Sequence, residues 1–365
     1  MNRLHLHLSH LEHNYKCIRS KLNPNTALIA VIKAGGYGSD PIKIAKRLEQ
    51  LGVSALAVAY AQEGASLRKA GVQTPILVFY PQPEGLEALV ENELEPCLYS
   101  TTILEQFRKL LQEKNRTHYP VHIKYNTGLN RVGFPPEKVN WVLAQFEEFE
   151  DQRFELKSVY SHLAAAEEPK ETPLSTHQIQ SFLKLKTQHQ ASLASKPLFH
   201  LLNSSGVFNY PEYQFDAVRC GIALHGFANR AEWDEQLKPV AELTSTISQI
   251  HQVKKGDFVG YDHGWEAPQD TVIATLPIGH ADGIGRHFGN HKAKVLLHQK
   301  WVPIVGNICM DMLMLDVTGV ACKEGDEVCF FGTKQSAADF AKKGETISYE
   351  LLANLGPRVE RIIHE

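Results

Sequence analysis

Lys33 stands where a short apolar segment, residues 28–32, meets a turn that contains Gly35, Gly36 and Tyr37. The apolar segment predicts a buried strand, and the glycines predict a sharp change of direction just after the lysine. An amine held among apolar neighbours loses solvation of its charged form, so its pKa falls and it can act as a nucleophile. Lys33 is therefore a candidate for a Schiff base with a carbonyl cofactor such as pyridoxal phosphate (PLP), although most lysines at strand ends simply extend to solvent.

Other polar residues stand where further apolar runs end, at 120–125, 155–161, 197–202 and 216–221. These residues are Lys124, Asn126, Thr127, Asn130, Arg131, Ser161, His162, Asn203, Ser204, Arg219, Gly221 and Ile222. If the runs are strands of one parallel barrel, their carboxyl ends share a rim, and the side chains face one pocket together with Lys33. This convergence predicts the site more strongly than any single motif does.

The types of these residues suit a phosphorylated aldehyde cofactor. Ser204 and the amides of Gly221 and Ile222 are predicted to hold a phosphate, as the last two loops of such barrels commonly do. Arg219 beside a pyridine nitrogen would disfavour protonation of that nitrogen, because like charges repel. Arg131 would neutralise the phenolate of the cofactor. Taken singly, each residue also has an ordinary explanation, such as a helix cap for Ser204 or a surface ion pair for Arg219.

The spacing of the apolar runs predicts the fold that positions this site. Eight strand-like runs alternate with helical or polar stretches, at about 27–33, 55–59, 75–80, 95–99, 120–125, 155–161, 197–202 and 216–221. Amphipathic segments predict helices at 61–70, 101–113, 136–149 and 174–193. Such an alternation is what an α/β (β/α)8 (TIM) barrel requires. The alternative is an open doubly wound sheet, but no G-x-G-x-x-G follows the first run, so its dinucleotide-binding form lacks its fingerprint.

The pattern changes after residue 235. Strand signals then follow one another without long helices, at 240–253, 271–278, 293–298, 301–307, 312–317 and 327–331, with one helical segment at 336–341. This predicts a mainly β C-terminal domain over residues 236–365, after a barrel domain over residues 1–235. A chain of 365 residues is long enough for two such domains.

Composition excludes several classes of function. The net charge of −3 provides no basic field for nucleic acid or an anionic membrane. None of the six cysteines has C-x-x-C spacing, and His287 and His291 flank a loop-like segment, so no metal site is predicted. The N-terminus lacks the apolar core of a signal peptide, and no segment approaches membrane-spanning length. We therefore expect a soluble, cytoplasmic protein.

Several segments together resemble the alanine racemase family, over residues 4 to 363. They are Ala-Val-Ile-Lys-Ala-Gly-Gly-Tyr-Gly around Lys33, His-Ile-Lys-Tyr-Asn-Thr-Gly-Leu-Asn-Arg-Val-Gly-Phe around Arg131, and Val-Arg-Cys-Gly-Ile around Arg219. Two more are Gly-Asn-Ile-Cys-Met-Asp, which ends at Asp311, and Ser-Tyr-Glu-Leu-Leu, which contains Tyr349. As a set these segments are highly specific for the family.

The resemblance implies a barrel followed by a β domain, PLP as cofactor, and interconversion of L-alanine and D-alanine, which would supply D-alanine for peptidoglycan. Lys33 would hold PLP as an aldimine, and Lys124 falls where many members carry a carbamylated lysine. The implied catalytic residues are Lys33, Tyr261, Arg131 and His162. The implied cofactor-binding residues are Lys33, Tyr37, Asn203, Ser204, Arg219, Gly221, Ile222 and Tyr349. The implied substrate-binding residues are Arg131, Met310 and Asp311.

The family racemises with two bases, a lysine and a tyrosine from the β domain of the partner subunit. Lys33 would serve the D-isomer face. Here the sequence departs from the resemblance, because the family segment usually reads Tyr-Gly-x-x-Tyr and residues 261–265 read Tyr-Asp-His-Gly-Trp. Trp265 therefore stands in the place of the tyrosine, and an indole N–H donates a hydrogen bond but cannot act as a base. Tyr261 or His263 could take the role, and the enzyme could also be slow, use one base with water, or have lost racemase activity.

The β-domain segment that ends at Asp311 implies a homodimer, because it would have to enter the pocket of a second subunit. Three alternatives stay open: a racemase for another small amino acid, a PLP decarboxylase of similar architecture, and a PLP-binding protein without catalysis. The β domain weighs against the last, since such proteins resemble the barrel alone. Chain length and the absence of a matching Cys-Asp pair weigh against the decarboxylase. Trp265, Ile284 and Met310 would set the size of the substrate pocket.

Overall fold

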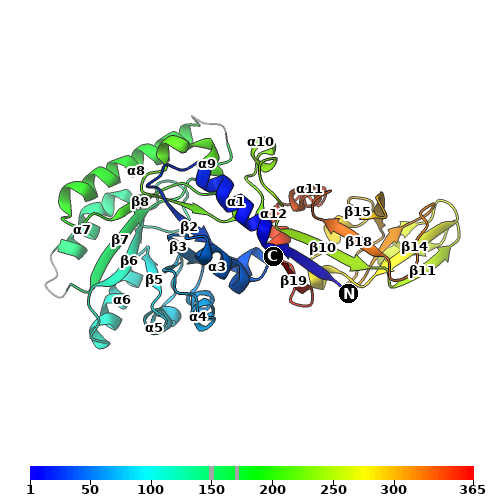
Figure 1. Ribbon diagram of the computed structural model, residues 1–365, viewed down its shortest axis with the longest axis horizontal. Helices are drawn as coiled ribbons and strands as arrows, with labels where there is room; N and C mark the ends of the chain where they lie inside the picture. The colour runs from blue at the N-terminus through cyan, green and yellow to red at the C-terminus, as the bar shows by residue number, and fades with distance from the viewer. Residues whose placement is uncertain (148–151, 169–171) are drawn as a thin grey trace.

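The computed structural model describes residues 1–147, 152–168 and 172–365, and shows a barrel domain beside a β domain in an elongated molecule (Figure 1). Eight parallel strands close the barrel in sequence order, because the last also pairs with the first. They are β2 (Ala27–Val31), β3 (Ala55–Val58), β4 (Ile76–Val78), β5 (Glu95–Leu98), β6 (Tyr119–Lys124), β7 (Phe154–Tyr160), β8 (Leu198–His200) and β9 (Ala217–Cys220). The predicted (β/α)8 barrel is confirmed, and the open sheet is excluded.

Helices cover the outside of the barrel. They are α1 (Leu8–Ser20), α3 (Pro41–Gln50), α4 (Ala61–Lys69), α5 (Leu86–Glu91), α6 (Thr101–Glu113), α7 (Val139–Glu147), α8 (Pro173–Ser192) and α9 (Ser204–Asn209). The helix predicted at 136–149 begins with the 3-10 turn Pro136–Lys138 and continues as α7, while residues 148 and 149 lie outside the described part. In α6, Ser100 caps the N-terminus, and Ile103, Phe107 and Leu110 form the buried stripe.

Alternation along each strand separates the two cores of the barrel. On β2, Leu28 and Ala30 pack against the surrounding helices, whereas Ile29 and Val31 belong to the cluster inside the barrel. Small residues such as Ala55 and Ala217 occupy further inward positions. Side chains that alternate in direction along each strand therefore bury apolar groups on both faces of the sheet, as a parallel barrel requires.

The second domain is built on a nine-stranded sheet with the order β11-β14-β17-β16-β15-β18-β10-β1-β19. Its strands are β1 (Arg3–His7), β10 (Ala241–Thr246), β11 (Gln249–Val253), β14 (Thr271–Leu276), β15 (Lys294–Leu297), β16 (Lys300–Val305), β17 (Leu313–Asp316), β18 (Glu327–Phe331) and β19 (Glu360–His364). A small hairpin, β12 (Phe258–Val259) and β13 (Trp265–Glu266), lies beside it in the chain. The prediction of a mainly β second domain is confirmed.

Details of this domain differ from the prediction. The apolar stretch 240–253 forms two strands, because β10 pairs with β1 and β18 while β11 pairs with β14. The helix predicted at 336–341 is α11 (Ala337–Lys343), and a second helix, α12 (Ser348–Ala353), follows it. Residue 236, where the second domain is predicted to begin, lies between α10 (Ala231–Asp234) and β10. The N-terminal β1, however, belongs to the sheet of the second domain.

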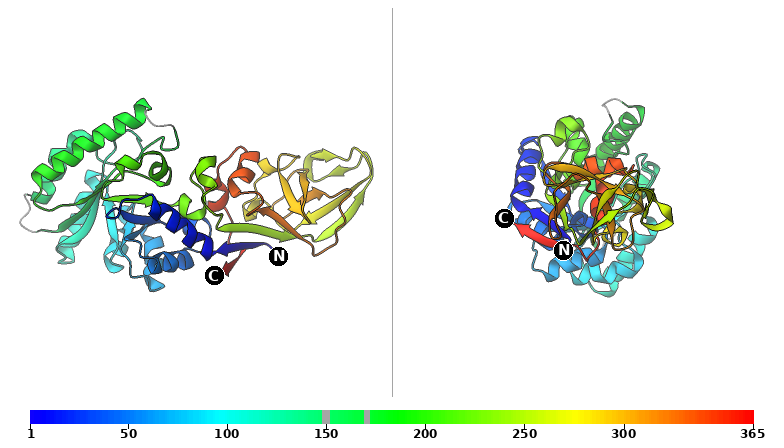
Figure 2. Two further views of the ribbon diagram at one scale, coloured as in Figure 1. Left: turned by 45° about the horizontal axis from the view of Figure 1, so that its top comes forward. Right: turned by 90° about the vertical axis from the view of Figure 1, so that its right-hand side faces the viewer.

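The two domains meet at the carboxyl end of the barrel. A Cβ added at Gly38, whose φ is +72°, would lie 1.8 Å from the carbonyl oxygen of Leu352 in α12. Arg361 also donates to the carbonyl of Gly38 at 2.8 Å, and Tyr37 and Leu352 share one apolar cluster. Figure 2 shows β1 and the adjacent α1 passing from one domain to the other. This close packing fixes α12 beside the rim of the barrel.

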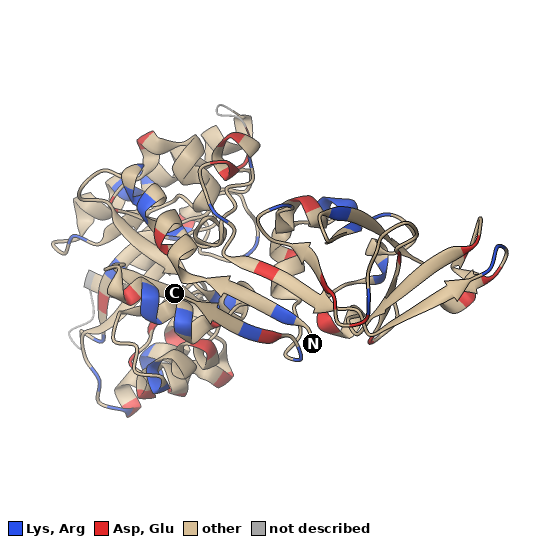
Figure 3. Cartoon of the chain, turned by 45° about the vertical axis from the view of Figure 1, so that its right-hand side comes forward, with Lys and Arg blue, Asp and Glu red and all other residues tan. Residues whose placement is uncertain are grey.

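Charged residues of both signs are interspersed over the two domains (Figure 3). Exposed ion pairs, such as Lys16 with Glu12 and Lys254 with Asp270, join neighbouring charges on the surface. In the described ranges, every helix is too short or too polar to cross a lipid bilayer.

Candidate active site

Lys33 begins a left-handed turn, α2 (Lys33–Tyr37), instead of ending the strand. β2 ends at Val31, and residues 34–37 have φ angles of 54°, 62°, 64° and 57°. The strand predicted to run to residue 33 is therefore two residues too long. Two of the four positions are glycines, which adopt this conformation without steric cost. Glu63 stabilises the turn, because its carboxylate accepts the amide of Ala34 at 2.6 Å and that of Ala59 at 2.7 Å.

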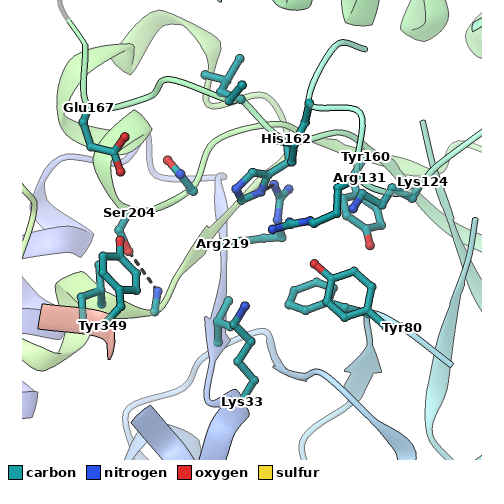
Figure 4. Close-up of a pocket in the computed structure, with 18 of the residues that line it drawn as sticks. Lys33, Tyr80, Lys124, Arg131, Tyr160, His162, Glu167, Ser204, Arg219 and Tyr349 are labelled. Atoms are coloured by element: carbon teal, nitrogen blue, oxygen red, sulfur yellow. Dashed lines mark hydrogen bonds between the residues drawn. The ribbon is translucent and has the colours of Figure 1, made fainter. Parts of the chain in front are cut away.

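A cavity of about 390 Å³ opens at the carboxyl ends of the barrel strands (Figure 4). The structure brings together here most of the side chains that the sequence predicted: Lys33, Tyr37, Lys124, Arg131, His162, Asn203, Ser204, Arg219, Gly221, Ile222 and Tyr349. It does not bring Tyr261, Met310 or Asp311 to this cavity.

Four cationic side chains line the cavity: Lys33, Lys124, Arg131 and Arg219. Burial, assisted by the charge of Arg131, lowers the pKa of Lys33 below its ordinary value. Burial and the charges of the two arginines lower the pKa of Lys124 to about 7. Glu167 also lines the cavity, but Figure 4 shows it across from Lys124 and Arg131. The site therefore suits an anionic ligand, and burial favours the uncharged form of the two lysine amines.

Arg219 is 3% exposed and is held by five contacts. Its guanidinium donates to the carbonyl oxygens of Ser161 at 2.7 Å, Leu201 at 2.9 Å and His200 at 3.2 Å. It also lies 2.7 Å from Nδ1 of His200 and 3.3 Å from Nδ1 of His162. Burial lowers the pKa of Arg219 to about 10, and burial together with the charge of Arg219 keeps the pKa of His162 well below its usual value. His162 is thus neutral and accepts at Nδ1.

Hydroxyl groups gather at another part of the cavity. The Oγ of Ser204 accepts the amides of Gly221 at 3.0 Å and Ala223 at 3.2 Å, which leaves its own proton free to donate. The ring centroids of Tyr37 and Tyr349 are 6.2 Å apart. A Cβ on Gly221 would lie 2.0 Å from the hydroxyl oxygen of Tyr37, so only glycine fits. These hydroxyl groups form a cradle that could hold a phosphate.

The residues present fit PLP. Lys33 would supply an amine of lowered pKa for the aldehyde, Arg219 is a buried donor that stays charged at neutral pH, and the hydroxyl groups around Ser204 would donate to the phosphate. The cationic lining balances the negative charge that the phosphate and phenolate carry.

The predicted residues of the β domain lie on an exposed surface. Tyr261 is 67% exposed and Met310 is 60% exposed. The side chain of Asn307 donates to the carbonyl of Tyr261 at 2.9 Å, which connects the two loops. Asp311 accepts from Arg358 at 2.7 Å. By contrast, Trp265 packs against a small apolar cluster of Val259, Ile273, Val305 and Met314.

Sequence reasoning missed some residues of the cavity. Tyr80 ends the predicted run 75–80, and Lys124 and Arg131 lie 5.3 and 5.6 Å from its ring centroid. Its place at a strand end was a usable signal. Glu167 lines the cavity from an irregular segment without such a signal. Asn229 is not part of the cavity lining, but it donates to the hydroxyl of Tyr349 at 3.0 Å.

Comparisons with known proteins agree with this architecture. The family model for the alanine racemase N-terminal domain matches residues 6–229, and that for the C-terminal domain matches residues 240–363. An alanine racemase of Treponema denticola is 34% identical over 98% of this chain and 96% of its own length. An alanine racemase of Methanococcus maripaludis is 35% identical over 97% of this chain and 96% of its own length.

Solved structures show the same similarity. An alanine racemase of Clostridium difficile 630 superposes with a TM-score of 0.92, at 30% identity, over 100% of this chain and 96% of that one. The alanine racemase of Bacillus anthracis with bound L-Ala-P superposes with a TM-score of 0.91, at 29% identity, over 100% of this chain and 95% of that one. Fold and site define the class, a PLP-dependent amino-acid racemase, which is an isomerase. The chain belongs to the alanine racemase family.

The close approach of Gly221 to Tyr37 predicts the result of a small substitution. Gly221→Ala is expected to weaken PLP binding by about tenfold or more, because the methyl group must displace the Tyr37 hydroxyl and such overpacking costs about 1–3 kcal/mol. Titration of the protein with PLP, followed by absorbance, measures this. Gly85→Ala is the control, since a Cβ there meets nothing nearer than 3.4 Å. Equal PLP affinity in both variants would contradict the cradle.

Proposed function

We propose that the protein interconverts L-alanine and D-alanine in the barrel cavity. The observation that carries this proposal is that one cavity joins the Lys33 amine, the buried Arg219 and the hydroxyl cradle around Ser204. Bound PLP withdraws electrons from Cα of the amino acid and thereby acidifies its proton. The side chains of the protein then decide on which face that proton leaves and returns.

Racemisation needs a base on one face of Cα and an acid on the other. For D-alanine, Nζ of Lys33 takes the Cα proton, and the hydroxyl of Tyr261 from the partner subunit donates its proton to the opposite face. For L-alanine the roles are exchanged. The lowered pKa of Lys33 supports this role, because a general base works best when its pKa is near ambient pH. Arg131 and His162 hold the cofactor and substrate in place between the two groups.

The second base comes from a homodimer in this proposal. Tyr261 and Met310 are exposed and lie outside the cavity of their own chain, whereas Trp265 is held in an apolar cluster. Tyr261 is therefore the side chain on this surface with a hydroxyl available to a second subunit. The loop with Met310 and Asp311 would contact the substrate in the same shared site.

Mixing two inactive variants tests the shared site. Lys33→Ala and Tyr261→Phe place their defects in one site of a mixed dimer and leave the other site intact. Co-refolding equal amounts is expected to restore about a quarter of wild-type activity, since half of the dimers are mixed and each has one intact site. Racemase activity is measured from both alanine isomers, with each variant refolded alone as control. If the mixture stays inactive, the two residues do not act across the interface.

Two finer points follow from the same site. We propose that Lys124 is carbamylated, because its pKa of about 7 leaves much of the amine neutral and able to add CO₂ with release of a proton, and because Arg131 and Arg219 would stabilise the new anion. The product D-alanine would serve peptidoglycan synthesis. We place the enzyme in the cytoplasm, since Cys17, Cys97, Cys220, Cys309, Cys322 and Cys329 are free thiols.

A further inference from the structure

A line of hydrogen-bonded side chains runs through the inside of the barrel, away from the cavity. Nδ1 of His200 is 2.7 Å from Arg219, and its Nε2 is 2.8 Å from Oγ of Ser158. The same Oγ is 2.6 Å from Nδ1 of His122, whose Nε2 is 2.9 Å from Oε2 of Glu95. The five residues lie on the five consecutive strands β9, β8, β7, β6 and β5. They connect the active site with the opposite mouth of the barrel.

The guanidinium at one end of this line and the carboxylate at the other fix the directions of the bonds that they make. A guanidinium can only donate, so Nδ1 of His200 must accept and the proton of that ring is on Nε2. That proton is donated to Ser158, whose own hydroxyl proton then goes to Nδ1 of His122. The carboxylate of Glu95 can only accept, so Nε2 of His122 carries a proton and donates it to Glu95. The line has one polarity, from a cation to a carboxylate.

The side chains of this line are buried, where hydrogen bonds are stronger than in water. Arg219, His200, Ser158 and His122 are each 5% exposed or less. No ion pair of the described residues includes Arg219, so the line is its connection to a negative charge. Burial opposes ionisation of Glu95, but the hydrogen bond from His122 helps to outweigh it, and the pKa of the carboxyl group is lowered. Hydrogen bonds in a line polarise one another. The carboxylate of Glu95 therefore makes Nδ1 of His200 a better acceptor for Arg219, by way of His122 and Ser158.

We propose that Glu95, His122 and Ser158 are positioning residues for the racemisation. They hold His200 in its Nε2–H tautomer, and His200 holds the guanidinium of Arg219 in a fixed orientation at the cavity. The inference rests on the proposed function and on the place expected for Arg219 from the sequence, beside the ring nitrogen of PLP. None of the three residues lines the active-site cavity, so they act through Arg219 alone.

The tautomers can be measured without any turnover. In ¹⁵N NMR spectra of the protein prepared without PLP, His200 is expected as a neutral ring with its proton on Nε2, and Nε2 of His122 is expected to carry a proton. Ser158→Ala is expected to shift the signals of these two rings and leave exposed histidines such as His177 unchanged. A His200 ring with a proton on Nδ1, or a His122 ring without a proton on Nε2, would overturn the proposal. This result does not depend on which amino acid the enzyme racemises.

The opposite mouth of the barrel provides a matched pair of carboxylates for kinetics. Glu95 and Glu155 both line a cavity of about 360 Å³ there, but Glu155 pairs with Lys157 outside the line. Glu95→Gln removes the charge and keeps an oxygen that can accept from His122. It is expected to lower kcat about threefold to tenfold with little change in KM, the factor that one hydrogen bond is worth. Glu155→Gln is expected to match the wild type.

Ser158→Ala is expected to lower kcat by a similar factor, and Ser158→Thr, which keeps the hydroxyl, to recover it. Unchanged kcat in Glu95→Gln, or an equal loss in Glu155→Gln, would overturn the proposal. If Ser158→Ala does not fold, the kcat of Glu95→Gln and the histidine tautomers of the wild-type protein still test the proposal. A wild-type protein that binds PLP but racemises no alanine would contradict the proposed function, while the tautomers would still test the line by themselves.

Discussion

Lys33→Ala is expected to abolish racemisation from both L-alanine and D-alanine. The variant loses the amine that binds the PLP aldehyde and also the base on one face of Cα, so kcat falls by a factor on the order of 10⁴ or more. Optical rotation is followed separately from each isomer. The yellow absorbance of the lysine-bound cofactor should disappear in the same variant.

Lys43→Ala is the control, because Lys43 is an exposed lysine on α3, close in sequence and outside the cavity. It should keep both the absorbance and the activity. If Lys33→Ala still racemised alanine at more than a trace of the wild-type rate, the cavity would not be the active site. The wild type could also show the yellow absorbance without racemising alanine, while Lys33→Ala lacks this absorbance. That result would instead indicate a cofactor site with another substrate.

Tyr261→Phe is expected to lower kcat by about 10²–10⁴-fold in both directions, the usual contribution of a general acid–base group. The fold should be unaffected, because the side chain is 67% exposed. Exchange of the Cα hydrogen in ²H₂O makes the test specific. D-Alanine should still exchange through Lys33 without inverting, whereas exchange of L-alanine should stop.

Trp265→Phe is the matched variant four residues away. Its indole packs against Val305 and Met314, so Phe preserves an apolar contact and should keep activity near the wild-type level. A large loss in Trp265→Phe together with full activity in Tyr261→Phe would reverse the assignment. Loss only in His263→Gln would move the role to His263, whose ring lies 4.5 Å from that of Phe258.

Much of the site could be predicted because its signals are local. The apolar run before Lys33 and the glycines after it define both the strand and the turn within ten residues. The strand-end rule then placed Arg131, Ser204 and Arg219 on one rim, and the structure brings them to one cavity. The same rule would have found Tyr80 had it been applied to the third run.

Other features depend on contacts between distant segments. The strand that β1 pairs with, through pairs such as Arg3 with Thr244, is set by a segment far away in the chain. Distant contacts also explain why the stretch 240–253 forms two strands and not one, since its two halves pair with different strands.

The sequence by itself determined the barrel, the β domain and the chemical identity of the groups around Lys33, because alternation and turn residues act over short distances. Only the tertiary structure decided that Tyr261 and Met310 lie outside the cavity of their own chain, and that Glu95 is linked to Arg219 through three other strands. The physical reason is register. Which inward side chains meet across neighbouring strands depends on strand pairing, and a shift of one residue would turn each of them to the other face.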